Sequence, residues 1–240
     1  MNPAKKGLGR GLSALFGDIE KKSKLNQTQE NKIPIADLER NKYQPRTIFD
    51  EEKLVTALEQ VLKIAPWPDE VLNADKKYHQ ICLTKRDFQE APECFYEGTG
   101  GVYRTMVDGQ EVIRQQELDE KDYGIFIPEF EKTYFKEVYD TLSQYVDSEY
   151  EGQLGRVRLI KSKPRSSLSW HRDPEPRLHV PIITNIGAKM IIEDEVKHLP
   201  VGRAWYTNTV FYHSQFNGGE EDRVHLVTSI ARKDNWWTMG

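Results

Sequence analysis

Cysteine is scarce in this sequence, and long apolar runs are absent. Cys82 and Cys94 are the only cysteines among 240 residues. They are too few for a disulfide framework or a four-thiolate zinc site, and this usage favours a cytoplasmic protein. No run of about 18 apolar residues occurs, so we expect no membrane-spanning helix. The N-terminal lysines precede no apolar stretch with a cleavage site, so we expect no secretory signal.

Basic residues are not in excess outside the N-terminus. The net charge of the chain is −4. Residues 1–24 have six lysines and arginines against two acidic residues, a net of +4, so the remainder is near −8. Such a remainder lacks the basic face that nucleic-acid binding needs. Hydrophobic residues make up 38% of the chain, enough for the core of one large domain or two small ones.

The first 60 residues differ in character from the rest. Residues 1–32 are rich in glycine, polar and basic, and we expect them to form a flexible, disordered tail. Residues 33–60 predict a short strand, a loop containing Pro45, and a helix that begins near Asp50, which is a favourable N-cap residue.

This N-terminal segment resembles the start of ParB-type chromosome-partition proteins. The similar stretches are KKGLGRGLSALFG, IPIADLERNKYQPR and FDEEKLVTALEQ, about a quarter of the chain. The family's later nucleotide-binding and helix-turn-helix motifs are not visible. The resemblance implies that residues 5–17 contact a ParA-type ATPase, which an arginine placed like Arg10 would stimulate. The alternative is a tail that has kept no role.

Residues 61–240 predict a further domain, with a barrel core at about 152–232. Residues 127–146 carry apolar side chains at steps of three and four, which indicates an amphipathic helix packed against a sheet. After Gly152 come short segments rich in β-branched and aromatic residues, bounded by Gly, Pro or Asn. They are typical of a sandwich or small barrel: GRVRLIKS, PRLHVPIIT, AKMIIEDEVKHL, RAWYTNTVFYH and DRVHLVTSIA.

Two of the six histidines lie in the stretch WHRDPEPRLHV at residues 170–180. His171 and Asp173 are two residues apart, so on an extended segment their side chains project to one side. His213 follows at the expected end of the strand at 203–213. Two imidazoles and one carboxylate form a facial triad, which leaves positions on Fe(II) open. By itself the pattern is weak, and the alternative is a polar loop running into a strand.

Arginines and further histidines occupy the neighbouring expected strands. Arg223 begins one strand, where it could grip a carboxylate in bidentate fashion, and His225 shares its face. Arg177 and His179 share a face of another strand. If these faces line the barrel, a ligand with two carboxylates would satisfy the buried charges. The alternative is an outward or salt-bridged position, for Arg223 with one of its acidic neighbours: Glu220, Glu221 or Asp222.

Residues 152–230 resemble the aspartyl/asparaginyl β-hydroxylase family of Fe(II)- and 2-oxoglutarate-dependent oxygenases. The similar stretches are GRVRLIKS, WHRDPEPRLHVPIITN, EDEVKHLPVGRAWYTNT and YHSQFNGGEEDRVHLV. The resemblance implies a mainly β fold with flanking helices (α+β), a double-stranded β-helix or cupin-like jelly roll. It implies iron ligands at His171, Asp173 and His213. It also implies that 2-oxoglutarate is held by its distal carboxylate at Arg223 and lies beside Arg177 and His179.

The implied activity is hydroxylation of an amino-acid or peptidyl side chain, such as Asp, Asn or Pro, with release of succinate and carbon dioxide. Residues 95–106, including Arg104, and residues 235–240 are candidates for substrate specificity. His79 and His198 have no partner at ligand spacing, so we expect surface or structural positions. Two alternatives remain: a partition-system adaptor with a non-catalytic barrel, and a cupin-like metal protein that does not use 2-oxoglutarate and has no need of Arg223.

Overall fold

The computed structural model describes residues 48–68, 78–96, 103–114 and 119–232. All of them belong to one compact unit, Asn41–Gly240. The expected tail at 1–32, the expected strand after it and residues 235–240 lie outside the described residues, as does part of the 95–106 segment. None of the described helices is long and apolar enough to cross a membrane.

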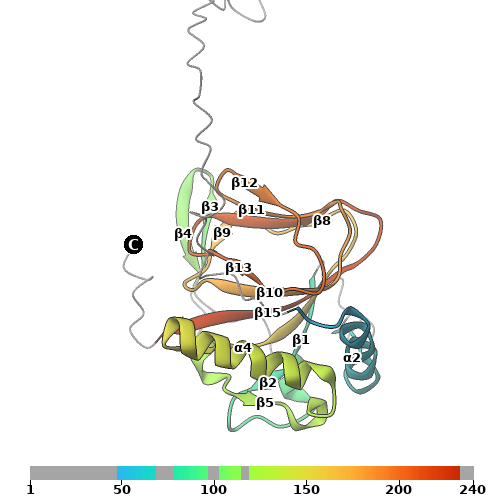
Figure 1. Ribbon diagram of the computed structural model, residues 1–240. Helices are drawn as coiled ribbons and strands as arrows, with labels where there is room; N and C mark the ends of the chain where they lie inside the picture. The colour runs from blue at the N-terminus through green and yellow to red at the C-terminus, as the bar shows by residue number, and fades with distance from the viewer. Residues whose placement is uncertain (1–47, 69–77, 97–102, 115–118, 233–240) are drawn as a thin grey trace, which may run out of the picture. The chain divides into compact units, whose positions relative to one another are not determined.

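Two antiparallel sheets form the body of the domain (Figure 1). In the first sheet the order is β1 (Tyr78–Cys82), β7 (Arg158–Ser162), β15 (Arg223–Arg232), β10 (Arg177–Ile183) and β13 (Trp205–Thr207), with β6 (Gly152–Leu154) on β15. In the second it is β12 (Glu195–Lys197), β11 (Ala188–Ile192), β14 (His213–Asn217), β9 (His171–Arg172), β3 (Tyr103–Val107) and β4 (Gln110–Arg114), with β8 (Ser166–Ser167) on β14. A separate pair joins β2 (Thr84–Lys85) and β5 (Ile125–Phe126). This arrangement confirms the predicted mainly β, jelly-roll fold with flanking helices.

Two helices flank the first sheet (Figure 1). Helix α2 (Glu51–Ile64) begins where the sequence predicted, because the Asp50 carboxylate accepts a hydrogen bond from the Lys53 backbone N–H at 3.0 Å. Helix α4 (Tyr134–Tyr150) begins later than predicted, because Pro128–Phe130 forms a separate 3₁₀ turn. Two further 3₁₀ turns lie at Glu93–Tyr96 and Glu120–Asp122.

The apolar core lies between these helices and the outer face of the first sheet. Alternate residues of β10 and β15 supply it, among them Leu178, Val180, Leu226 and Ile230, and α4 contributes a buried apolar stripe. Because strand residues alternate between two faces, the intervening residues point to the inside of the barrel. Those residues are largely polar: Arg177, His179, Arg223, His225 and Ser229.

Two expected strands are divided in the structure. Residues 188–199 form the hairpin of β11 and β12, with Glu193 at a left-handed φ of 52° in its turn. The strand expected at 203–213 ends at Thr207, because a turn follows in which the Phe211 N–H donates to the Asn208 carbonyl. His213 therefore begins β14 and does not end the preceding strand as expected.

Candidate metal centre

The second sheet brings His171, Asp173 and His213 together at one end of the barrel. Strand β9 pairs with β14 so that His171 lies directly opposite His213. The Asp173 backbone N–H donates to the Thr209 carbonyl at 2.8 Å, which holds the carboxylate beside the two rings. One potential ligand atom from each of the three residues lies within 4.8 Å of the others. One metal ion can therefore reach all three.

Hydrogen bonds orient both imidazoles for metal binding. His171 Nδ1 lies 2.7 Å from the Ser169 carbonyl oxygen, and His213 Nδ1 lies 3.0 Å from the Phe211 carbonyl oxygen. A carbonyl only accepts, so each Nδ1 carries a proton and Nε2 is the ring nitrogen left to bind a metal. The two Nε2 atoms lie 3.9 and 3.5 Å from the Asp173 carboxylate.

The protonation states of the cluster also suit a metal. Burial opposes ionisation of Asp173 and is the largest single effect on its pKa. Arg177, with Nε 2.7 Å from Oδ2, acts together with His213, His171 and Arg158 to outweigh burial, so the carboxyl pKa stays below its usual value. Burial lowers the pKa of His213 to about 4. The site therefore offers a carboxylate and a neutral imidazole at neutral pH, without first losing protons.

Deeper in the barrel, Arg223 is buried without an anion. Its side chain is 3% exposed, and within the described residues no carboxylate lies at ion-pair distance from it. The neighbouring Glu220 pairs with the exposed Arg165 at 2.8 Å. Burial lowers the pKa of Arg223 to about 9, which still leaves the guanidinium charged at neutral pH.

Two histidines next to Arg223 carry ring nitrogens that lack hydrogen bonds. Arg223 Nη2 donates to His225 Nδ1 at 2.8 Å, so the proton of this ring lies on Nε2, which has no partner. Both nitrogens of His179 are buried and unpaired. Burial, and next Arg223, lower the pKa of His179, so the ring is neutral. Register places His179 opposite Val227, four residues along β15 from Arg223 and two from His225. The side chains of His179 and His225 thus leave several polar atoms beside Arg223 without a hydrogen-bond partner.

Comparison with known families assigns this part of the chain. The model of the aspartyl/asparaginyl β-hydroxylase family matches residues 115–233, which contain the triad and Arg223. Residues 115–233 belong to the aspartyl/asparaginyl β-hydroxylase family. The matched residues, called the hydroxylase domain below, contain helix α4 and the strands from β5 to β15, whereas β1 to β4 lie before them.

Similarity to individual proteins is low. An oxidoreductase of the 2OG-Fe(II) oxygenase family from Burkholderia pseudomallei is 12% identical, with 78% of this chain and 82% of that chain covered and a TM-score of 0.49. A cupin domain from Bordetella pertussis Tohama I is 18% identical, with 31% and 79% covered and a TM-score of 0.28.

One curated protein, Stage 0 sporulation protein J of Bacillus subtilis (strain 168), is a distant ParB-like relative. It is 30% identical over 161 residues, which cover 66% of this chain and 52% of that protein. The chain therefore spans about half the length of this relative. The alignment covers more of the chain than the expected 60 residues. Even if it began at residue 1, an alignment over 66% of the chain would extend past residue 115 and into the hydroxylase domain.

The remaining histidines of the sequence analysis lie apart from the triad. His79 is buried, at 1% exposure, and not at the surface. His198 is half-buried, and its Nδ1 donates to the Ala188 carbonyl at 3.0 Å, which is a structural contact. The backbone of Arg104 pairs with Arg172 between β3 and β9, next to His171; its side chain lies outside the described part of the chain.

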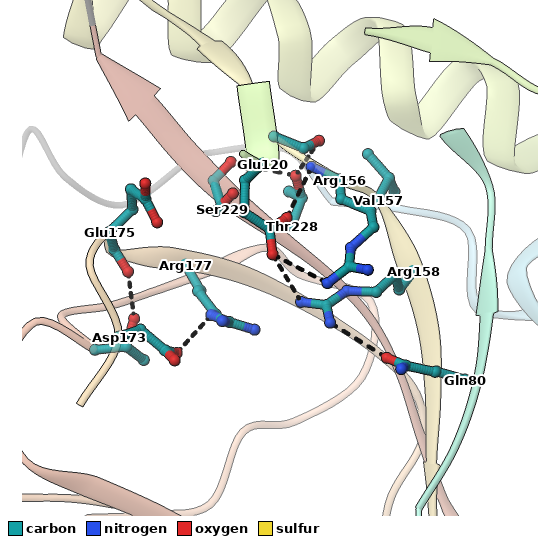
Figure 2. A network of polar contacts seen from close by, with 12 residues as sticks. Gln80, Glu120, Arg156, Val157, Arg158, Asp173, Glu175, Arg177, Thr228 and Ser229 are labelled. Atoms are coloured by element: carbon teal, nitrogen blue, oxygen red, sulfur yellow. Dashed lines mark hydrogen bonds and ion pairs between the residues drawn. The ribbon is translucent and has the colours of Figure 1, made fainter. Parts of the chain in front are cut away.

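Several polar residues of the hydroxylase domain were not among the candidates that the sequence pattern predicted. Gln215 lies two residues after His213 on the same face of β14, and its Nε2 donates to Ser162 Oγ at 2.8 Å across the barrel. Because strand residues alternate between two faces, the spacing of two residues from His213 could have identified Gln215. A charged cluster was also missed: Glu120, Arg156 and Arg158 (Figure 2). Nothing in the sequence indicates that Glu120 meets Arg156, because 36 residues separate them.

Proposed function

We propose that the hydroxylase domain is an Fe(II)- and 2-oxoglutarate-dependent dioxygenase. Its substrate would be an amino-acid or peptidyl side chain, of the Asp, Asn or Pro kind, and succinate and carbon dioxide would be released. One observation carries the proposal: a buried Arg223 without a carboxylate shares a barrel interior with a His-Asp-His triad. A metal protein that uses no 2-oxoglutarate has no need of this arginine.

The residues present fit both groups. His171, Asp173 and His213 would hold Fe(II), and as a facial triad they leave three positions open. Arg223 would hold the distal carboxylate of 2-oxoglutarate, and the unpaired His179 would lie beside the cosubstrate. When bound, iron and 2-oxoglutarate would supply the means of activating dioxygen, the oxidant, which protein side chains lack.

The side chains of the protein position and protect these groups. Arg177 fixes the orientation of Asp173 through the 2.7 Å contact and keeps it ionised. His225 accepts from Arg223 and so aims the guanidinium along the barrel. A ligand with hydrogen-bonding groups beside His179 and His225 would pair their buried ring nitrogens, which favours its binding.

Cosubstrate binding and turnover test the proposal. The protein is loaded anaerobically with Fe(II), titrated with 2-oxoglutarate by calorimetry, and then assayed with oxygen for succinate release over a panel of amino acids and peptides. We expect 2-oxoglutarate to bind with one site per chain and succinate to depend on a panel member. His171→Ala is the control that lacks one ligand. Absence of 2-oxoglutarate binding to the iron-loaded wild type would overturn the proposal.

We propose as a second candidate that residues 5–17 contact a ParA-type ATPase, with the barrel as a non-catalytic body. The 30% identity with the sporulation protein supports this candidate. A peptide of residues 1–20 should stimulate ATP hydrolysis by a ParA-type ATPase, and the Arg10→Ala peptide should not. Equal rates with and without the wild-type peptide would exclude it.

A further inference from the structure

The charged groups around the triad include more cations than anions. Iron and 2-oxoglutarate carry charges of +2 and −2, so their joint binding does not change the balance. Isolated charges are costly to bury, and the surplus indicates that the complete site takes up another anion. Four guanidiniums meet two buried carboxylates: Arg156, Arg158, Arg177 and Arg223 against Glu120 and Asp173.

Glu175 lies at the edge of this group, and no ion pair joins it to the guanidiniums drawn in Figure 2, of which Arg177 is paired with Asp173.

Arg158 is the guanidinium that these pairings leave over. Arg177 pairs with Asp173, and Arg223 is assigned to 2-oxoglutarate. Arg156 binds Glu120 twice, through Nη2 to Oε1 and through its backbone N–H to Oε2, each at 3.1 Å.

The hydrogen bonds of Arg158 involve only part of its guanidinium group. Its Nη2 is 3.9 Å from Glu120 Oε1, beyond hydrogen-bond distance, and its Nη1 donates to Gln80 Oε1 at 3.2 Å. Nε and Nη2 have no hydrogen-bond partner, although the side chain is only 4% exposed.

The register of the first sheet places the side chain of Arg158 on the same side as residues of the candidate site. In register, Arg158 of β7 lies opposite Val227 of β15, which lies opposite His179 of β10. Residues directly opposite in antiparallel strands share a face, so Arg158 projects to the same side as His179. Figure 2 shows the guanidiniums of Arg158 and Arg177 pointing toward one another, with Asp173 beyond Arg177. Two like charges so arranged are stabilised by an anion held next to both.

We propose that Arg158 binds a carboxylate of the substrate and restricts the enzyme to substrates that carry one near the hydroxylated carbon. This inference rests on the proposed dioxygenase function and names its substrate class. The planar fork matches a carboxylate, whereas a neutral amide accepts through a single oxygen. The competing explanation is that Arg158 only balances the charge of Glu120.

Paired probes that differ in one carboxylate distinguish these explanations. We would use end-blocked peptides with a central Asp or a central Asn, and L-proline with L-prolinamide. Each is titrated by calorimetry into protein loaded with Fe(II) and 2-oxoglutarate without oxygen, so binding is read without turnover. We expect the wild type to bind the carboxylate member of at least one pair about tenfold more tightly, which is 1.4 kcal/mol. Arg158→Gln should bind both members with equal affinity, and Arg158→Lys should lie between.

Two controls separate the possible failures. Arg165→Gln removes an arginine that is 75% exposed and paired with Glu220, and it should retain the wild-type preference. All variants should bind 2-oxoglutarate as the wild type does, because Arg223 and the triad are unchanged. If the wild type shows no carboxylate preference in any pair, or Arg158→Gln retains it, the inference is wrong. If 2-oxoglutarate does not bind the wild type, it is the proposed function that fails. Arg158→Lys keeps a charge beside Glu120 and replaces the Gln variant should that one not fold.

Discussion

Replacing Arg223 with methionine should weaken cosubstrate binding and yet not destabilise the protein. A charge-assisted hydrogen bond contributes about 1.5–3 kcal/mol, so loss of the guanidinium should raise the dissociation constant of 2-oxoglutarate between about tenfold and about a hundredfold. Arg223→Lys keeps the charge but not the fork, and its affinity should lie between those of wild type and methionine variant. Iron binding should persist, since no ligand of the triad is touched.

The effect on stability follows from the environment of the guanidinium. Burial lowers the pKa of Arg223 to about 9, and no carboxylate among the described residues offsets that cost. In the ligand-free wild type the buried charge therefore lowers the free energy of unfolding, and the methionine variant lacks this charge. Replacing buried ionic groups by apolar residues of similar volume is often neutral or stabilising, by up to about 4 kcal/mol, so the urea midpoint of the ligand-free variant should equal or exceed that of wild type.

Two measurements on the same samples decide this prediction. Calorimetric titration of 2-oxoglutarate into iron-loaded protein gives the affinity, and urea unfolding of ligand-free protein gives the stability. Arg165→Met is the matched control, because it removes an exposed arginine and should change neither. A variant that unfolds at clearly lower urea while binding 2-oxoglutarate like wild type would show that Arg223 is structural, and would refute the reasoning.

Three further outcomes are expected. His213→Ala should lose stoichiometric iron, measured by metal analysis after gel filtration, while His198→Ala retains it; iron retained in the first variant would exclude His213 as a ligand. Because the folded-state pKa of Glu175 is raised to about 7 from 4.5, its stabilising effect is complete below about pH 4.5 and is lost as the pH rises through 7. Glu175→Gln should therefore stabilise metal-free protein by about 1–3 kcal/mol at pH 8 and by little at pH 4.5, and equal urea midpoints at pH 8 would contradict this. Deleting residues 1–32 should leave turnover unchanged, and a large loss of activity would assign that segment to the catalytic domain.

The sequence predicted the parts of this fold that depend on local pattern. Alternation identified β7, β10 and β15, and Asp50 marked the start of α2, because the side chain itself makes the capping bond. It placed His213 on the wrong strand, because the aromatic run before it looks extended while backbone hydrogen bonds from residue 207 to 211 close a turn.

Prediction of the site depended on how far apart its residues are in the chain. The triad candidates and the alternation of Arg223 with His225 could be recognised within single segments. The pairing of Glu120 with Arg156, the free edge of Arg158 and the bond from Gln215 to Ser162 could not, because each depends on packing between distant segments.

The two faces of strand β15 have different roles, one in packing and one in the proposed ligand binding. Its even-numbered residues, such as Leu226 and Ile230, hold the helices to the sheet, whereas the odd-numbered Arg223 and His225 face the interior and carry no part of that packing. Odd positions can therefore be exchanged with little penalty to folding. A library confined to inward positions of β7, β10 and β15 should yield mostly folded proteins with altered ligand preference, and the same library shifted by one residue should yield mostly unfolded ones.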